Sequence, residues 1–136
     1  MSKTGWRLPV VLAAVALAVS LWLPWVYFGS ATRTSFGVFR SAQRLGFDEL
    51  APFRVGWYLL PVASIAVMLF ALLEWRRRAS WLLLLLAVVE GVPAFLVVVA
   101  GGAAIGANVA LAASWCALVV GALTLRAGRV AGSDKA

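Results

Sequence analysis

Four long apolar runs constrain this chain more than any other feature of its sequence. They extend over about 8–28, 55–75, 81–100 and 107–125. A helix rises about 1.5 Å per residue, so each run is long enough to cross the roughly 30 Å hydrocarbon core of a bilayer. Because lipid offers the backbone no hydrogen-bond partners, such runs are expected to be helices. The sequence therefore predicts an all-α integral membrane protein, with one transmembrane domain over 1–136.

The composition excludes several other classes of protein. Of the 136 residues, 64% are hydrophobic and 12% are charged, and the mean hydropathy is +0.99. Soluble domains hold about 45–50% apolar and about 25% charged residues. The net charge of +7 is therefore expected to orient membrane helices and to contact lipid headgroups. Binding of nucleic acid is not expected, because it requires a basic surface that faces water.

The topology follows from the connections and from the positions of the basic residues. Short connections at 76–80 and 101–106 predict antiparallel neighbours in an up-down-up-down four-helix bundle. With a cytoplasmic N-terminus, eight Lys and Arg residues lie on the cytoplasmic side and four on the other. The positive-inside rule favours this arrangement, which makes both termini cytoplasmic in a multi-pass protein of the cytoplasmic (inner) membrane.

The first run could instead be a cleaved signal peptide. Lys3 and Arg7 supply a charged start, and Ala16-Leu17-Ala18 resembles a cleavage site. The apolar stretch continues through 19–25 and reaches full spanning length, whereas the apolar part of a signal peptide has only about 7–15 residues. A retained helix is therefore favoured.

Cysteine and histidine usage limits the available chemistry. The chain has one cysteine, Cys116, and no histidine, so an intramolecular disulfide is impossible and a metal site built from His and Cys is not expected. The commonest general base is missing as well. Cys116 lies in an apolar run and is expected to be a small buried hydrophobic residue.

The loop at 29–54, expected on the outer side, is rich in Phe and Arg. Ser35 is expected to cap a short helix that Gly46 ends, with Arg40 and Arg44 on one face. In one interpretation the aromatic residues cap the bundle and the arginines extend to lipid phosphates. In the other, the loop is a docking surface for a partner protein or an anionic lipid, since four arginines on the disfavoured side need a reason. The candidate residues are Arg33, Phe36, Phe39, Arg40, Arg44, Phe47 and Arg54.

Glu90 is the one ionisable residue well inside a predicted helix. A carboxyl group there is costly and usually faces the bundle interior, a cavity or a proton path. Ser64, Ser114 and Cys116 fall at similar depth, which predicts a weakly polar layer across the second, third and fourth helices. Glu90 then either hydrogen-bonds to such a group or to a carbonyl freed by Pro93, or it moves protons or substrate. Proton relays normally use several ionisable groups, which favours the first role.

Two further patterns concern helix packing and orientation. Small residues recur in and before the fourth run, and such residues let helices approach closely, either within the chain or in a dimer. They are Gly102, Gly106, Ala110, Ala117 and Gly121. The cluster Arg76-Arg77-Arg78 is expected to face water on the cytoplasmic side, where its positive charges act as a topology signal that sets the orientation of the helices.

The first half of the chain resembles a known group of proteins. The residues that carry the resemblance are Leu23-Pro24-Trp25 at the exit of the first run, the loop segments Arg33-Thr34-Ser35-Phe36 and Phe39-Arg40-Ser41-Ala42-Gln43-Arg44-Leu45-Gly46, and Phe53-Arg54-Val55-Gly56-Trp57. Together they resemble uncharacterised small four-helix membrane proteins of actinobacteria. By analogy, the resemblance implies an accessory subunit of a larger envelope machine, such as a lipid importer of the mammalian-cell-entry type.

The sequence thus predicts a non-catalytic inner-membrane protein without a cofactor, acting as an accessory or stabilising subunit of a cell-envelope complex. Its expected partners are membrane lipids and another integral membrane protein. The alternative is a small lipid-binding protein or transporter that uses Glu90 and the outer-loop arginines. An intramembrane enzyme would need a base and a nucleophile within hydrogen-bond reach, for which Glu90 with Ser64 or Ser114 is the available pair.

Overall fold

The computed structural model describes residues 5–44, 46 and 51–133, and these are mostly helical. The elements are α1 (Arg7–Ser20), β1 (Pro24–Phe28), β2 (Ala31–Thr34), α2 (Ser35–Arg44), α3 (Ala51–Leu72), α4 (Arg76–Val99) and α5 (Ile105–Ser133). Within these residues, three segments are long and apolar enough to cross a membrane, namely Pro52–Leu72, Arg76–Val99 and Ile105–Ala127. The chain is therefore a membrane-embedded, mainly helical protein.

The first apolar run was predicted to form one helix over 8–28, and the structure differs from this prediction. Helix α1 ends at Ser20, and a turn leads into strand β1 at Pro24. Pro24 explains the change, because proline has no backbone N–H and disfavours the helical conformation in the residue before it. The strand turns back through Gly29 and Ser30, and Gly29 adopts a positive φ of 60°. The run thus holds a 14-residue helix followed by half of a β-hairpin.

The hairpin is paired along both edges of β1. Strand β2 pairs antiparallel with β1, with Val26 opposite Arg33 and Phe28 opposite Ala31. On the other edge, the connection between α4 and α5 contacts the strand: Tyr27 N donates to Gly102 O at 3.2 Å, and Ala104 N donates to Trp25 O at 2.8 Å. The segment predicted as a simple turn at 101–106 therefore also satisfies the backbone of β1.

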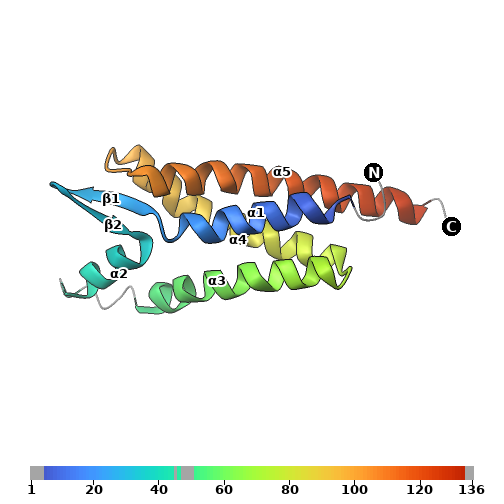
Figure 1. Cartoon of the computed structure of the whole chain (residues 1–136), viewed down its shortest axis with the longest axis horizontal. Coiled ribbons are helices and arrows are strands. Elements are labelled where there is room, and N and C mark those ends of the chain that lie inside the picture. The colour runs from blue at the N-terminus through green and yellow to red at the C-terminus, as the bar shows by residue number, and fades with distance from the viewer. Residues whose placement is uncertain (1–4, 45, 47–50, 134–136) are drawn as a thin grey trace.

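Helices α1, α3, α4 and α5 pack side by side, and Figure 1 shows the chain direction alternating along this series. Helix α1 contacts the other three, and α4 contacts both α3 and α5. Their shared core consists of small and branched side chains, among them Val10, Ala14, Leu17, Val67, Ala71, Leu83, Ala87, Ala110 and Ala117. Small residues allow the helices to approach closely, as membrane helices require in the absence of a hydrophobic drive from water.

The bounds of the three long helices also differ from the predicted ones. Helix α3 begins and ends earlier than the run 55–75, and α5 extends beyond 107–125 in both directions. Helix α4 includes Arg76, Arg77 and Arg78, which were predicted to lie in a turn. The chain reverses instead just before them, where Glu74 adopts a positive φ of 64°. Arginine is a good helix former, so charge alone does not keep these residues out of a helix.

Candidate functional site

Glu90 lies in the centre of the bundle and contacts α1. It belongs to the buried face of α4, which also presents Leu83, Ala87 and Ala94. Its side chain is 1% exposed, and its carboxyl group accepts a hydrogen bond from Ser20 Oγ. Burying a polar group is costly unless it is hydrogen-bonded, so this contact offsets part of the cost of placing Glu90 there.

Ser20 connects Glu90 to the end of α1. Its single hydroxyl hydrogen serves either the Glu90 carboxyl group or Leu17 O, which lies 2.7 Å from its Oγ, and its own carbonyl accepts from Trp25 Nε1 at 2.8 Å. Ser20 was not among the residues predicted from the sequence, because the predicted polar layer included only the second, third and fourth helices. The available signal was that Ser20 is the first polar residue after Arg7 in the first run.

The other members of the predicted polar layer do not contact Glu90 through any described hydrogen bond. Ser64 is buried in α3 and donates to Leu60 O of its own helix at 3.0 Å. Ser114 is buried in α5, and its Oγ has no hydrogen-bond partner among the described residues. It packs against Gly91, where an added Cβ would lie 2.9 Å from Ser114 Cβ. Ser114 and Gly91 also line a groove of about 320 Å³ between α4 and α5.

The prediction that Cys116 is a small buried residue is wrong. It is exposed on the outer face of α5, next to the exposed Trp115. Successive residues of a helix point about 100° apart, so Ser114 and Cys116 cannot share one narrow face. The predicted layer depended on position along each helix and did not specify the direction in which each side chain points.

The hairpin and α2 form a head at one end of the bundle, defined here as residues 24–44. Thr34, and not Ser35, caps α2, because Gly37 N donates to Thr34 Oγ1 at 3.2 Å. Ser35 Oγ donates instead to Leu21 O at 2.8 Å, which joins α2 to the C-cap residue of α1. The short helix itself, with Arg40 and Arg44 at i, i+4 spacing, is confirmed.

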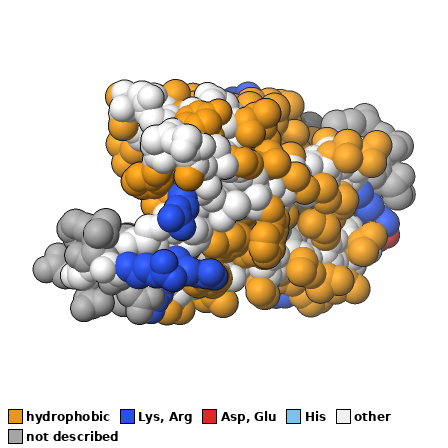
Figure 2. All heavy atoms as spheres, turned by 60° about the vertical axis from the view of Figure 1, so that its left-hand side comes forward, with side chains coloured by type: hydrophobic (Ala, Val, Ile, Leu, Met, Phe, Trp, Pro, Cys, Tyr) orange, Lys and Arg blue, Asp and Glu red, His pale blue; other side chains and the backbone are white. Residues whose placement is uncertain are grey.

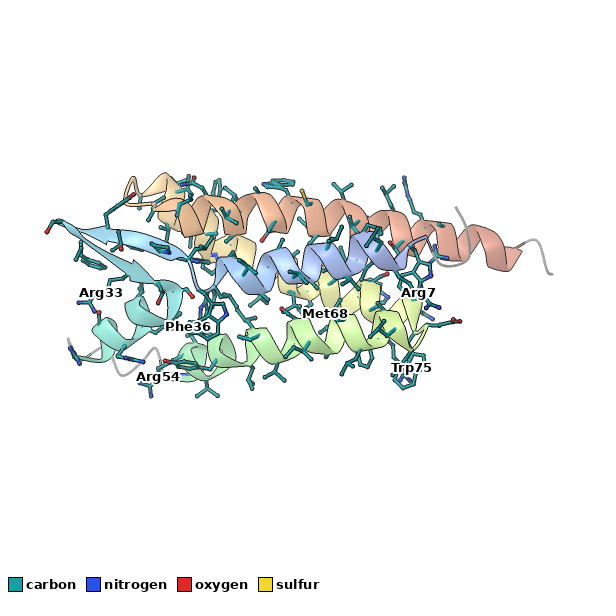
Figure 3. The ribbon with its side chains drawn as sticks, in the orientation of Figure 1. Arg7, Arg33, Phe36, Arg54, Met68 and Trp75 are labelled. Carbon is teal, nitrogen blue, oxygen red and sulfur yellow. The ribbon has the colours of Figure 1, made fainter. Side chains whose placement is uncertain are left out.

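Aromatic side chains hold the head against the bundle. Phe36 of α2 stacks on Tyr58 of α3, with ring centroids 5.2 Å apart, and also contacts Trp22 at 5.0 Å. Trp57 of α3 contacts both Trp25 and Phe39, each at 5.4 Å. Such aromatic pairs contribute about 0.5–1.5 kcal/mol beyond their buried area. Figure 3 shows Phe36 at this junction between the head and α3.

The predicted arginines of the outer loop lie at the head and at the start of α3. Arg33, Arg40 and Arg44 are exposed, whereas Arg54 is partly buried near the start of α3. Figure 3 shows Arg33 and Arg54 at this end of the molecule, and Figure 2 shows Lys and Arg side chains gathered on the face turned toward the viewer. Phe47 lies outside the described residues.

The predicted packing residues face the interior of this same chain. An added Cβ at Gly106 would lie 2.5 Å from Pro24 O, and one at Gly121 would lie 2.8 Å from Leu84. Ala110 and Ala117 are buried between them, and Gly102 is partly buried beside Val26. The small residues therefore serve close contacts between α5, α4 and the segment that leaves α1.

The described residues include no group of three His, Cys, Asp or Glu side chains that could hold a metal ion. Comparison with protein-family models, with curated proteins and with solved structures finds no match to this chain. The resemblance to small actinobacterial membrane proteins therefore stays a prediction.

Proposed function

We propose that this chain is a non-catalytic accessory subunit of a larger membrane complex in the cell envelope, and that it docks through its head. The observation that supports this most strongly is the head itself, a basic structure packed on the end of the bundle through aromatic side chains. Its interlocked aromatic rings and the two paired edges of β1 restrict its motion. A preorganised surface loses little conformational freedom on binding, which favours docking.

The charges of the head are available to a partner. Within the described residues, Arg33, Arg40 and Arg44 have no acidic partner: Glu90 is buried in the bundle, and Glu74 pairs with Arg7 at the opposite end. Asp48 and Glu49 belong to the same loop but lie outside the described residues. Arginine is enriched in protein interfaces, where its planar group binds carboxylates with two hydrogen bonds. We therefore expect a partner with acidic groups near the membrane surface.

The proposed topology has four crossings, with both termini on the cytoplasmic side. Helix α1 has 14 residues and covers only about 21 Å at 1.5 Å per residue, so the turn at 21–23 must extend the first crossing as far as the head. The backbone of this turn is hydrogen-bonded within the chain, because Trp22 N donates to Val19 O and Leu23 N donates to Ser20 O. The end that holds Arg7, Arg76, Arg77, Arg78 and Arg126 would face the cytoplasm, in agreement with the positive-inside rule.

The burial of Glu90 supports a packing role over the alternative of a transporter. A group that carries protons or substrate must reach water at some stage, and Glu90 is enclosed and bonded to Ser20. A lipid transport system remains a suitable setting for the proposed accessory subunit, because the head would lie at the surface of the bilayer.

Affinity purification from native membranes in mild detergent tests the docking proposal. The triple variant R33Q/R40Q/R44Q removes three exposed charges from the head. The matched control R77Q/R78Q/R126Q removes three exposed charges from the opposite end. We expect one stoichiometric integral membrane partner with the wild type and the control, and at least about a tenfold loss of it with the head variant, since interfacial charge complementarity contributes to binding. Retention of the partner by the head variant, or a wild type that purifies alone, contradicts the proposal.

A further inference from the structure

A second feature lies at the opposite end of the bundle and is independent of the head. It is a groove of about 680 Å³ between the end of α3 and the first turns of α4. We call it the basic groove, and its lining residues are Phe70, Arg77, Arg78, Trp81, Leu82 and Leu85. Arg77, Trp81 and Leu85 follow one another at i, i+4 spacing, so they form one stripe along α4.

Polarity changes in one direction along this groove. The two arginines occupy the first turn of α4, and Leu82 and Leu85 lie farther along its apolar span, while Phe70 near the end of α3 contacts Trp75 with ring centroids 5.5 Å apart. From Arg77 to Leu85 the helix rises about 12 Å at 1.5 Å per residue. Trp81 lies between these two parts and is exposed, as tryptophan typically is where the hydrocarbon meets the headgroups. A phospholipid has the same order, with a charged headgroup followed by an apolar chain.

The three consecutive arginines are used differently. Arg76 turns into the bundle, where its Nε donates to Thr124 O at 3.0 Å and its guanidinium lies over the Trp6 ring. Arg78 lies over the Trp75 ring at 4.6 Å and is exposed, and Arg77 is exposed without an acidic partner among the described residues. Glu74, the nearby acid, is paired with Arg7. A topology signal requires only the charge, whereas here two of the charges are placed at the end of an apolar groove.

The backbone of α4 adds to the attraction for an anion. No side chain caps the start of this helix, and its first turn contains no acidic residue. The free N–H groups and the positive end of the helix dipole therefore favour negative charge at the position that the two arginines occupy. The start of α4 and the two arginines thus both favour an anion at this end of the groove.

We propose that the basic groove binds one anionic phospholipid of the surrounding bilayer. The phosphate lies at Arg77 and Arg78, and an acyl chain lies along Phe70, Leu82 and Leu85. Charge complementarity selects an anionic headgroup over a zwitterionic one, because each basic side chain near the membrane surface contributes separately to binding. The proposal depends only on the chain being embedded in a membrane, and not on the accessory role of the head.

Native mass spectrometry of the full-length chain tests this site. Delipidated protein in detergent is titrated with phosphatidylglycerol or with phosphatidylcholine of the same acyl composition. We expect one phosphatidylglycerol to bind selectively, and R77Q/R78Q to weaken it about 30-fold, the factor that corresponds to two basic groups. The matched control R40Q/R44Q likewise removes two exposed arginines, but from the head, and should bind the lipid like the wild type. R77K/R78K keeps both charges and should retain most of the binding.

Several outcomes would overturn the proposal. Equal binding of the two lipids would exclude selection by charge, and equal loss in both Gln variants would show only a general effect of net charge. Displacement of the lipid by excess inorganic phosphate would identify a phosphate site without a role for the apolar groove. Circular dichroism of each variant checks that it is folded, which we expect because Arg77 and Arg78 are exposed. Loss of the protein partner in the head variant does not bear on this test.

Discussion

At the level of single residues, the environment of Glu90 favours internal packing over proton transfer, the two roles expected for it. A carboxyl group at this depth is compatible with a proton path or with internal packing. The structure encloses it on the buried face of α4 and provides the Ser20 hydroxyl as its partner. Its depth was predictable from the sequence, because distance along a helix follows from residue number. Its partner was not, because that contact depends on how α1 packs against α4.

Substitution of Glu90 separates packing from proton transfer. Glu90→Gln keeps the volume and an acceptor for Ser20 Oγ, so we expect stability close to that of the wild type. Glu90→Ala leaves a cavity and removes the acceptor, and should lower the free energy of unfolding by about 2–5 kcal/mol. Unfolding in mixed detergent, followed by circular dichroism, measures both changes. A Gln variant as unstable as the Ala variant would contradict the packing role.

Ser20 and Ser64 provide a matched pair for the same question. Both are buried serines whose Oγ lies within hydrogen-bond distance of a carbonyl of their own helix, but only the Ser20 hydroxyl also contacts Glu90. Ser20→Ala leaves the Glu90 carboxyl group without its partner and should cost about 1–3 kcal/mol. Ser64→Ala removes only an intrahelical bond, so a smaller cost is expected. Equal costs in the same unfolding assay would show that the contact with Glu90 contributes nothing.

At the scale of elements, the segment that leaves α1 shows how one proline redirects a chain. Hydropathy alone favours a helix through residue 28, because it does not register the missing N–H of Pro24. The resulting strand is stable only because β2 and the connection between α4 and α5 supply hydrogen bonds on its two edges. The second of these contacts joins residues that are far apart in the sequence, so no local pattern could have predicted it.

Gly106 tests this junction between elements. A Cβ at this position would lie 2.5 Å from Pro24 O, which is backbone and cannot rotate away. Gly106→Ala should therefore destabilise the protein by about 1–3 kcal/mol through overpacking. Gly56→Ala is the matched control, because a Cβ there meets nothing within 4 Å, and alanine in a helix gains about 0.5–1 kcal/mol over glycine. Thermal unfolding in detergent should order the proteins as G56A, wild type, G106A, and a stable G106A would contradict the close packing.

At the scale of the whole molecule, the two ends of the bundle differ in structure and in proposed function. The head end combines a hairpin, a short helix and aromatic contacts, whereas the opposite end has a tight turn, the Arg7–Glu74 ion pair and the basic groove. Figure 3 shows this separation, with Arg33 and Phe36 at one end and Arg7 and Trp75 at the other. The proposed orientation places the head outside and the basic groove at the cytoplasmic surface.

Cysteine labelling tests that orientation. In a Cys116→Ser background, Ser30→Cys places a thiol in the exposed hairpin turn and Ser133→Cys places one at the end of α5. A maleimide that does not cross membranes should label the first variant in intact spheroplasts, and the second only after permeabilisation. If the second variant reacts in intact spheroplasts and the first one is protected, the orientation is opposite to the one proposed. It would leave the contacts within the bundle unaffected.

The sequence was sufficient to predict the membrane class, the three long apolar helices and the small residues of the packing faces, because hydropathy, length and side-chain size act locally. It also determined the short helix over Ser35–Arg44, whose turn residues and basic face are adjacent in the chain. The packing of the folded chain fixes the partner of Glu90, the exposure of Cys116 and the strand after Pro24. It also divided the three arginines between the bundle and the basic groove. Each of these depends on the rotation of one helix against another, and residue spacing within one helix does not specify that rotation.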